Sequence, residues 1–166
     1  MKPEARAGVS AYVGLGSNLD NPAEQIRSAF RYLEQIAETE LVSQSSLYRS
    51  APLGSIEQPD FVNAVAKLST LLDAQALLAQ LQQIERSQGR VYGDRWGPRI
   101  LDLDLLLYGD HQISSPALTV PHPGIQHRNF VLLPLREIEP DLVIPGVARI
   151  SDIPVDANNP EISQIV

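Results

Sequence analysis

Apolar residues near the start of the chain follow first a strand-like and then a helix-like pattern. Residues 9–15 (VSAYVGL) form a short apolar run, and over residues 22–38 apolar side chains recur every three or four positions. Asn21 and Pro22 open this second segment in the way that an N-cap and a first-turn proline do. The pattern therefore predicts a strand followed by an amphipathic helix.

Two further strand-like segments follow with no helix between them. Residues 41–48 alternate between apolar and polar positions, and so do residues 61–69, where Val62 and Leu68 share the face expected to enter the core. Asn63 lies on the opposite face. The stretch between these segments is rich in turn-forming residues, so the pattern predicts two strands joined by a loop.

A second helix and a last strand are predicted next. Asp73 is typical of an N-cap, apolar side chains recur along one face from there to about residue 88, and Gly89 marks the expected end. Residues 101–108 form the most strand-like run of the chain, and prolines punctuate the remainder. The regular elements that we predict therefore end with this strand.

The predicted order is strand, helix, strand, strand, helix, strand. With no internal repeat, this order is typical of an α+β ferredoxin-like sandwich, in which helices cover one face of an antiparallel sheet. The two consecutive strands disfavour a doubly wound parallel sheet. We expect a single domain over residues 1–166, with its core at about residues 9–154 and short tails at both ends.

The composition limits the chemistry. With 43% hydrophobic and 20% charged residues the chain is typical of a soluble globular protein, and the lack of cysteine excludes disulfides and thiolate metal sites. Any metal would therefore bind oxygen or imidazole ligands, which favours a hard cation. No signal-peptide pattern and no run of ~18 apolar residues is present, so we expect a cytoplasmic protein without a membrane partner.

The charges are unevenly distributed along the chain. A formal net charge of −7 argues against a general nucleic-acid binder, because phosphate backbones are bound by basic surfaces. Four arginines nevertheless fall close together, at positions 86, 90, 95 and 99. A small ligand rich in phosphate suits this local positive charge.

Two aspartates stand in the strand-like run after these arginines. Asp102 and Asp104 are two positions apart, so in a strand they project from one face at about 7 Å from each other, while the alternate leucines enter the core. A solvated strand face is one interpretation. Aspartates are depleted in strands and repel each other when adjacent, and a bound cation would remove that repulsion. Magnesium, which binds one or two carboxylates together with substrate phosphates, fits the pair and its neighbouring arginines.

At this strand the sequence resembles a known enzyme family. The stretch RWGPRILDLDLL is similar to the signature of the 6-hydroxymethyl-7,8-dihydropterin pyrophosphokinases, which are folate-synthesis enzymes with a ferredoxin-like fold. The same family pattern continues over about residues 9–145, in the segments VGLGSNL, SLYRSAPLGSIEQPDFVNA, QIERSQGR and TVPHPGIQHRNFVLLPL. The resemblance implies that the hydroxymethyl oxygen of the pterin attacks the β-phosphorus of ATP and that AMP leaves.

The resemblance also assigns roles to individual residues. It implies two Mg²⁺ ions held by Asp102 and Asp104, with Arg90 and Arg99 neutralising the charge that develops on the phosphates. The ATP-binding positions are Gln82, Glu85, Arg95, Trp96, Arg99, His122 and Arg128. The pterin-binding positions are Ser50, Leu53, Phe61, Asn63, Trp96 and Phe130. Because of its glycines, the segment 89–97 is expected to close over both substrates.

Several alternatives stay open at this stage. His122 can be a loop histidine without a task, Phe61 and Phe130 can be ordinary core residues, and the arginines can form surface salt bridges. A ferredoxin-like sheet can also be a nucleic-acid or regulatory binding module, although an exposed strand face that carries two aspartates would repel a phosphate backbone. A pathway partner without activity is disfavoured because the aspartates and arginines of the family pattern are present. We expect a monomer that binds small molecules only.

Overall fold

A six-stranded antiparallel sheet forms the centre of the computed structural model, which describes residues 8–19, 21–52, 57–88 and 101–165. The elements of the predicted core are β1 (Val9–Ser17), α1 (Pro22–Glu34), β2 (Thr39–Gln44), β3 (Tyr48–Ser50), β4 (Phe61–Thr70), α2 (Ala74–Ser87) and β5 (Asp102–Tyr108). One edge of β4 pairs with β1, which pairs in turn with β5. The other edge of β4 pairs with β2 and β3, and a last strand, β10 (Ile162–Gln164), adds to β3.

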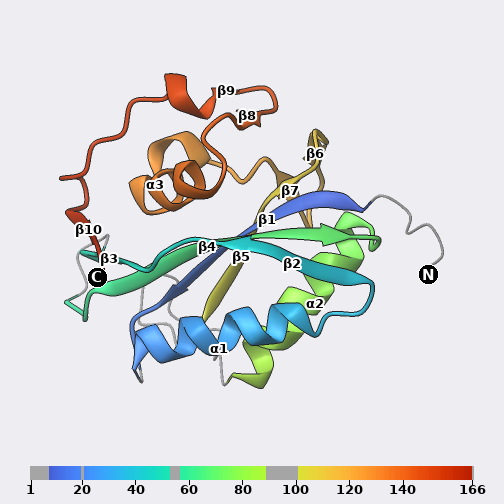
Figure 1. Cartoon of the computed structure of the whole chain (residues 1–166), viewed down its shortest axis with the longest axis horizontal. Coiled ribbons are helices and arrows are strands. Elements are labelled where there is room, and N and C mark those ends of the chain that lie inside the picture. The colour runs from blue at the N-terminus through green and yellow to red at the C-terminus, as the bar shows by residue number, and fades with distance from the viewer. Residues whose placement is uncertain (1–7, 20, 53–56, 89–100, 166) are drawn as a thin grey trace.

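Helices cover both faces of this sheet (Figure 1). On one face α1 and α2 bury the larger apolar core, which includes the alternate residues of β4 from Val62 to Leu68 and those of β5 from Leu103 to Leu105. On the other face lies α3 (Asn129–Ile138), over a second core that includes Val65 and Leu106. The predicted α+β ferredoxin-like architecture is therefore confirmed, and the expectation that helices cover one face only is wrong.

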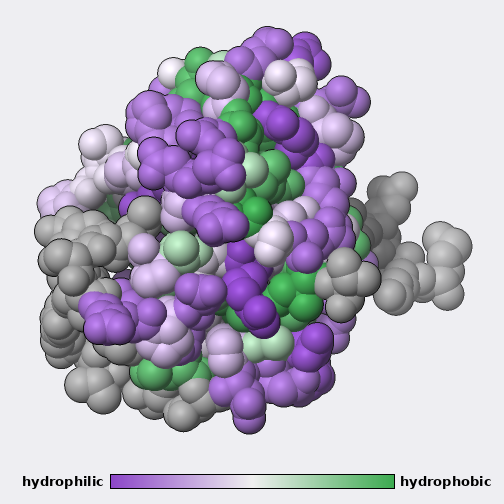
Figure 2. Space-filling model, turned by 90° about the vertical axis from the view of Figure 1, so that its left-hand side faces the viewer, coloured by the Kyte–Doolittle hydropathy of each residue, from purple (hydrophilic) through white to green (hydrophobic). Residues whose placement is uncertain are grey.

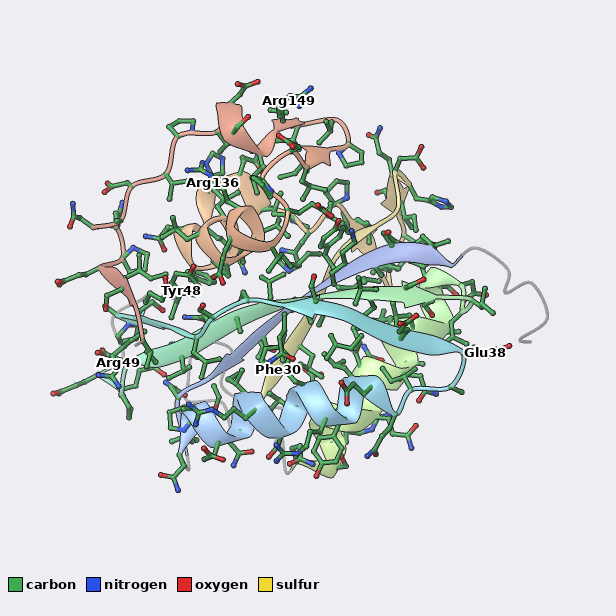
Figure 3. All side chains as sticks on the ribbon, in the orientation of Figure 1. Phe30, Glu38, Tyr48, Arg49, Arg136 and Arg149 are labelled. Carbon is green, nitrogen blue, oxygen red and sulfur yellow. The ribbon has the colours of Figure 1, made fainter. Side chains whose placement is uncertain are left out.

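The sequence pattern did not predict α3, and its proline explains why. Pro134 lies inside the helix, where a proline removes a backbone donor and normally ends a helical pattern. The helix persists because its apolar side chains are buried against the sheet. Figure 3 shows Phe30 of α1 pointing to one face of the sheet and Tyr48 of β3 pointing to the other, toward α3.

Small elements connect α3 to the rest of the molecule. They are β6 (Ile113–Ser114), β7 (Thr119–Val120), η1 (Ile125–His127), β8 (Val143–Ile144), β9 (Ala148–Arg149) and η2 (Ile150–Asp152). The side chain of Arg136 on α3 donates to the carbonyls of Ile150 (3.3 Å) and Ile153 (2.9 Å) and so fixes the segment that follows. The chain then returns to the sheet as β10.

The helix ends differ in how well the sequence predicted them. The side chain of Asp73 accepts a hydrogen bond from the N–H of Ala76 at 2.7 Å, as expected of an N-cap. Asn21 makes no side-chain cap hydrogen bond, because its backbone is left-handed at a φ of 59°. The first helix stops at Glu34 rather than at residue 38, although Ile36 beyond its end is still buried.

A buried serine divides the strand that was predicted over residues 41–48. The N–H of Ser45 donates to the carbonyl of Val65 (2.9 Å), and the Oγ of Ser45 accepts from the N–H of Val65 (2.9 Å). The side chain thus takes the place of a backbone partner, and the edge is split into β2 and β3. This split leaves β3 as a short strand of its own beside Asn63.

Candidate active site

The strand β5 carries Asp102 and Asp104 on the sheet face that α3 partly covers. Leu103, between the two aspartates, and Leu105, just after them, are buried in the core on the opposite face, as the alternation of apolar and polar residues predicted. Both aspartates are only partly buried. Two carboxylates on one strand face form a set of oxygen donors suited to Mg²⁺. Among the described residues there is no cluster of three or more possible metal ligands.

His122 lies beside this pair of carboxylates. Its Nε2 is 3.9 Å from Oδ1 of Asp104, and its backbone N–H donates to the carbonyl of Leu106 at 2.9 Å, which holds the loop against β5. Burial lowers the pKa of His122 below its ordinary value, and the charge of Arg128 lowers it further, against the raising effects of its Pro123 hydrogen bond and of Asp102. A largely neutral imidazole therefore faces the aspartates.

Arg128 and Phe130 stand at the start of α3. The guanidinium of Arg128 lies 5.8 Å from the centroid of the Phe130 ring, within the range of a cation–π contact. Both side chains are half-buried and so remain available to a ligand. The charge of Arg128 also acts on His122, which places these two predicted ATP-binding residues near each other.

The predicted pterin residues of β3 and β4 form a connected group. The Nδ2 of Asn63 donates to the Oγ of Ser50 at 2.6 Å, and both side chains are buried. Phe61 lies opposite Ser50 in the strand register and is partly exposed. The serine holds the amide of Asn63 in one orientation, with its Oδ1 turned toward Gly16.

Gly16 separates this group from the aspartates. In the register Gly16 faces Asn63 on one side and Asp102 on the other, so these two side chains are two strand spacings apart, about 10 Å. A Cβ at Gly16 would lie 3.4 Å from Oδ1 of Asn63 and 4.0 Å from the ring of Phe61. The glycine therefore leaves bare backbone between the two halves of the site. Gly16 had no predicted role, although two glycines at alternate strand positions, Gly14 and Gly16, are a usable signal of a close approach to backbone.

Glu85 and Gln82 of α2 lie at different depths. The side chain of Glu85 is 4% exposed, and its Oε2 accepts from the N–H of Leu103 at 2.8 Å. This contact ties the end of α2 to the strand that carries the aspartates. Gln82, one turn earlier, is exposed to solvent. The contact of both residues with ATP stays a prediction.

Comparison with known proteins identifies the family. Residues 12–140 match the family of 7,8-dihydro-6-hydroxymethylpterin-pyrophosphokinases. The chain belongs to this family. It is 50% identical to the 2-amino-4-hydroxy-6-hydroxymethyldihydropteridine pyrophosphokinase of Haemophilus influenzae, over 87% of this chain and 91% of that protein. It is 54% identical to the enzyme of the same name from Pseudomonas aeruginosa, over 86% and 88% of the two chains. The resemblance stated from the sequence motifs is confirmed.

Solved structures agree on the fold of this pyrophosphokinase family member. A crystal structure described as HPPK-DHPS in complex with substrates superposes with a TM-score of 0.69 at 13% identity, over 89% of this chain. A wild-type Plasmodium falciparum HPPK-DHPS with pteroate gives a TM-score of 0.71 at 14% identity, over 88% of this chain. The chain spans 43% and 44% of these two proteins, respectively. At such identities the likeness concerns the fold.

Some of the predicted site lies outside the described residues. These positions are Leu53, Arg90, Arg95, Trp96 and Arg99, together with the segment 89–97 that was expected to close over the substrates. The structure brings the remaining predicted residues onto one sheet face, except for Gln82 and Glu85 on α2. In the part of the chain that the structure describes, no helix is long and apolar enough to cross a membrane.

Proposed function

We propose that this chain uses Asp102, Asp104 and Asn63 to transfer a pyrophosphoryl group from ATP to 6-hydroxymethyl-7,8-dihydropterin, giving the pterin diphosphate and AMP. Membership of the pyrophosphokinase family supports the reaction. The observation that carries the assignment of residues is the single sheet face on which two carboxylates and a buried, oriented amide lie on either side of Gly16.

The pterin would lie at the Asn63 side of Gly16. Asn63 offers an oxygen and one remaining N–H to the polar edge of a flat heterocycle, because Ser50 occupies its other N–H. Phe61 and Phe130 supply aromatic surfaces for the ring. With Leu53 and Trp96, these residues make up the proposed pterin site.

The phosphates of ATP would lie at the aspartate side of Gly16. Two Mg²⁺ ions bound by Asp102 and Asp104 would neutralise phosphate charge and orient the β-phosphoryl group. His122 lies beside the carboxylates and Arg128 acts on His122, and both would bind the nucleotide, with a neutral imidazole as donor or acceptor. Gln82, Glu85, Arg95 and Trp96 complete the proposed nucleotide site.

The span between the two halves of the site suits the reaction. A hydroxymethyl group on a ring held at Asn63 must reach across Gly16 to a phosphate held at Asp102, and in the strand register of the described residues Gly16, which has no side chain, lies between them. The alcohol oxygen then attacks the β-phosphorus and its proton is released to solvent, while the bond from that phosphorus to the α-phosphate oxygen breaks and AMP departs with that oxygen. Arg90 and Arg99 would hold the phosphates in line and offset the charge that develops on them.

The identity of the nucleotide product tests this function. Incubation with ATP, Mg²⁺ and 6-hydroxymethyl-7,8-dihydropterin should yield AMP and pterin diphosphate in equal amounts, measured by chromatography and ³¹P NMR. Asp102→Asn and Asp104→Asn keep the side-chain volume but lose a charged ligand, so each should lower kcat by about a thousandfold with little change in Tm. Asp110→Asn, which changes an exposed carboxylate just beyond β5, is the matched control. Formation of ADP, or near-normal turnover in either site variant, contradicts the proposal.

The setting of this activity is also part of the proposal. The chain would act as a monomer in the cytoplasm, where its co-substrate ATP is available.

A further inference from the structure

A segment outside the family match lies against both walls of the proposed pterin site. The match ends at residue 140, and the chain continues through residues 155–165, which we call the C-terminal arm. In Figure 1 the arm descends past the start of α3 and joins the sheet beside β3 as β10. One wall of the pterin site is the start of α3, with Phe130, and the other is formed by β3 and β4, with Ser50 and Asn63.

Asn129 attaches the arm to the first wall. Its Nδ2 donates to the carbonyls of Asp156 and Pro160, each at 2.7 Å, and its side chain is 4% exposed. The same turn is closed internally, since the N–H of Ile162 donates to the carbonyl of Ala157 at 3.0 Å. Because Asn129 immediately precedes Phe130, this attachment fixes the arm relative to the aromatic side chain of the wall.

Backbone hydrogen bonds attach the arm to the second wall. In the register of β10 and β3, Ile162 faces Ser50 and Ser163 faces Arg49. Beyond the strand ends, the N–H of Ala51 donates to the carbonyl of Glu161 at 3.0 Å, and that of Ile165 to the carbonyl of Leu47 at 2.8 Å. The arm thus converts β3 from a three-residue edge strand into an internal one.

The surface around β3 and β10 is mostly hydrophilic (Figure 2), which agrees with an arm that is attached to the sheet through backbone hydrogen bonds. Figure 2 views the side on which β3 and β10 lie, and hydrophilic residues predominate there, with apolar residues in separate small groups. Most of β10 is exposed, and Ile162 is its one buried side chain. The arm is therefore held by hydrogen bonds to Asn129 and β3, together with the apolar packing of Val155, Ile162 and Ile165.

We propose that the C-terminal arm is a positioning element for the pterin substrate. By bracing β3 it holds the Oγ of Ser50 at the Nδ2 of Asn63, so that the amide of Asn63 presents a fixed edge to the heterocycle. Through Asn129 the arm also holds the wall formed by β3 and β4 at a constant separation from Phe130 on the other wall. The inference rests on the proposed function, because it assumes that Asn63 and Phe130 bind the pterin.

A proline in β10 tests the bracing of β3. Ser163→Pro removes the N–H that faces Arg49 in the ladder, whereas Ser163→Ala changes the same exposed side chain and keeps that N–H. Calorimetry on the full chain should show that Ser163→Pro binds 6-hydroxymethyl-7,8-dihydropterin about tenfold more weakly. Binding of a nonhydrolysable ATP analogue should stay within about twofold, and Ser163→Ala should resemble the wild type in both measurements.

A second variant acts from the other wall. Asn129→Ala removes both donors to the arm and should raise the KM for the pterin more than it lowers kcat. If the two sites act through the same arm, Ser163→Pro combined with Asn129→Ala should weaken pterin binding by less than the product of the single effects. Variants with lowered Tm but normal pterin affinity, or with equal losses for pterin and nucleotide, would show that the arm only stabilises the fold. A wild-type chain that binds no pterin would instead overturn the proposed function.

Discussion

Gly16 is the residue that joins the two halves of the proposed site. It faces Asn63 and Asp102 across its two strand ladders, and a side chain there would project toward the amide oxygen of Asn63. A hydroxymethyl group that crosses from one half to the other must pass close to this backbone. A Cβ at Gly16 would make only ordinary contacts, so packing alone does not require a glycine here, and the proposed transfer supplies a reason for one.

Gly16→Ala should impair use of the pterin specifically. The added methyl makes an ordinary contact with Oδ1 of Asn63 at 3.4 Å but occupies the space that the hydroxymethyl group would cross, so the KM for the pterin should rise about tenfold while affinity for a nonhydrolysable ATP analogue is retained. Steady-state kinetics and calorimetry measure the two effects. The matched variant Gly14→Ala adds a methyl on the same strand, 3.3 Å from the side chain of Leu106, and should lower Tm with little change in that KM. Equal pterin KM values for the two variants would contradict this role of Gly16.

Strand periodicity could predict the relative positions of site residues only where those residues lie close together in the sequence. The two-residue period of a strand places Asp102 and Asp104 on one face of the sheet. It also places Asn63 on the face opposite the larger core. The approach of His122 to Asp104 depends on how a loop returns to β5, and strand periodicity says nothing about it. Those longer-range assignments came from resemblance to a family.

Among the elements, α3 links the proposed site to the body of the sheet. Its far end carries two glutamates that contact different strands. Glu137 accepts from Tyr48 at 2.6 Å and from the N–H and Oγ of Ser46, and Glu139 accepts from Lys67 at 2.5 Å and from Tyr12 at 2.9 Å. These contacts fix the position of the helix that begins at Asn129.

Glu139→Gln should lower stability at neutral pH and have less effect in acid. The hydrogen bond from Lys67, followed by that from Tyr12, holds the pKa of Glu139 below its ordinary value of 4.5. Its carboxylate therefore stabilises the fold above that value, and the contribution is lost as the pH falls through the lower pKa of the folded state. Because the pair is partly exposed, the expected loss at pH 7 is about 1 kcal/mol.

Urea unfolding at pH 7 and at about pH 3 measures this dependence. The difference between Glu139→Gln and the wild type should shrink at the lower pH. Glu40→Gln, which changes an exposed glutamate on β2, should show no comparable difference at pH 7. A deficit of the Glu139 variant that is the same at both pH values would mean that the charge of Glu139 does not contribute.

Local sequence patterns predicted the elements whose apolar residues recur with a regular period or whose N-cap residue makes the expected hydrogen bond. β4, β5 and α2 appeared close to their expected positions, because alternation and the Asp73 cap are local signals. The third helix was missed because Pro134 interrupts it, and the division of β2 from β3 was missed because it depends on Ser45 pairing with Val65. Both features depend on tertiary contacts.

For the molecule as a whole, the monomer stays a prediction, and its exposed apolar side chains show where to test it. The described residues include five exposed large apolar side chains, at positions 32, 42, 71, 143 and 147. They belong to α1, β2, the loop after β4 and the β8–β9 hairpin. The strand β2 is one of the sheet edges at which a second copy could add, and Val42 is 50% exposed there.

Sedimentation equilibrium at micromolar concentration should therefore give a mass close to 18.2 kDa. The mass should also stay the same in 0.5 M salt, where the Debye length is about 4 Å and the net charge of −7 is largely screened. A rise in mass at this salt concentration would show that charge repulsion alone had kept the copies apart. Val42→Lys places a charge on the exposed edge of β2, and on a monomer it should leave both mass and turnover unchanged. A species of twice the mass that Val42→Lys dissociates would show that the sheet continues between copies through β2 and would contradict the monomer.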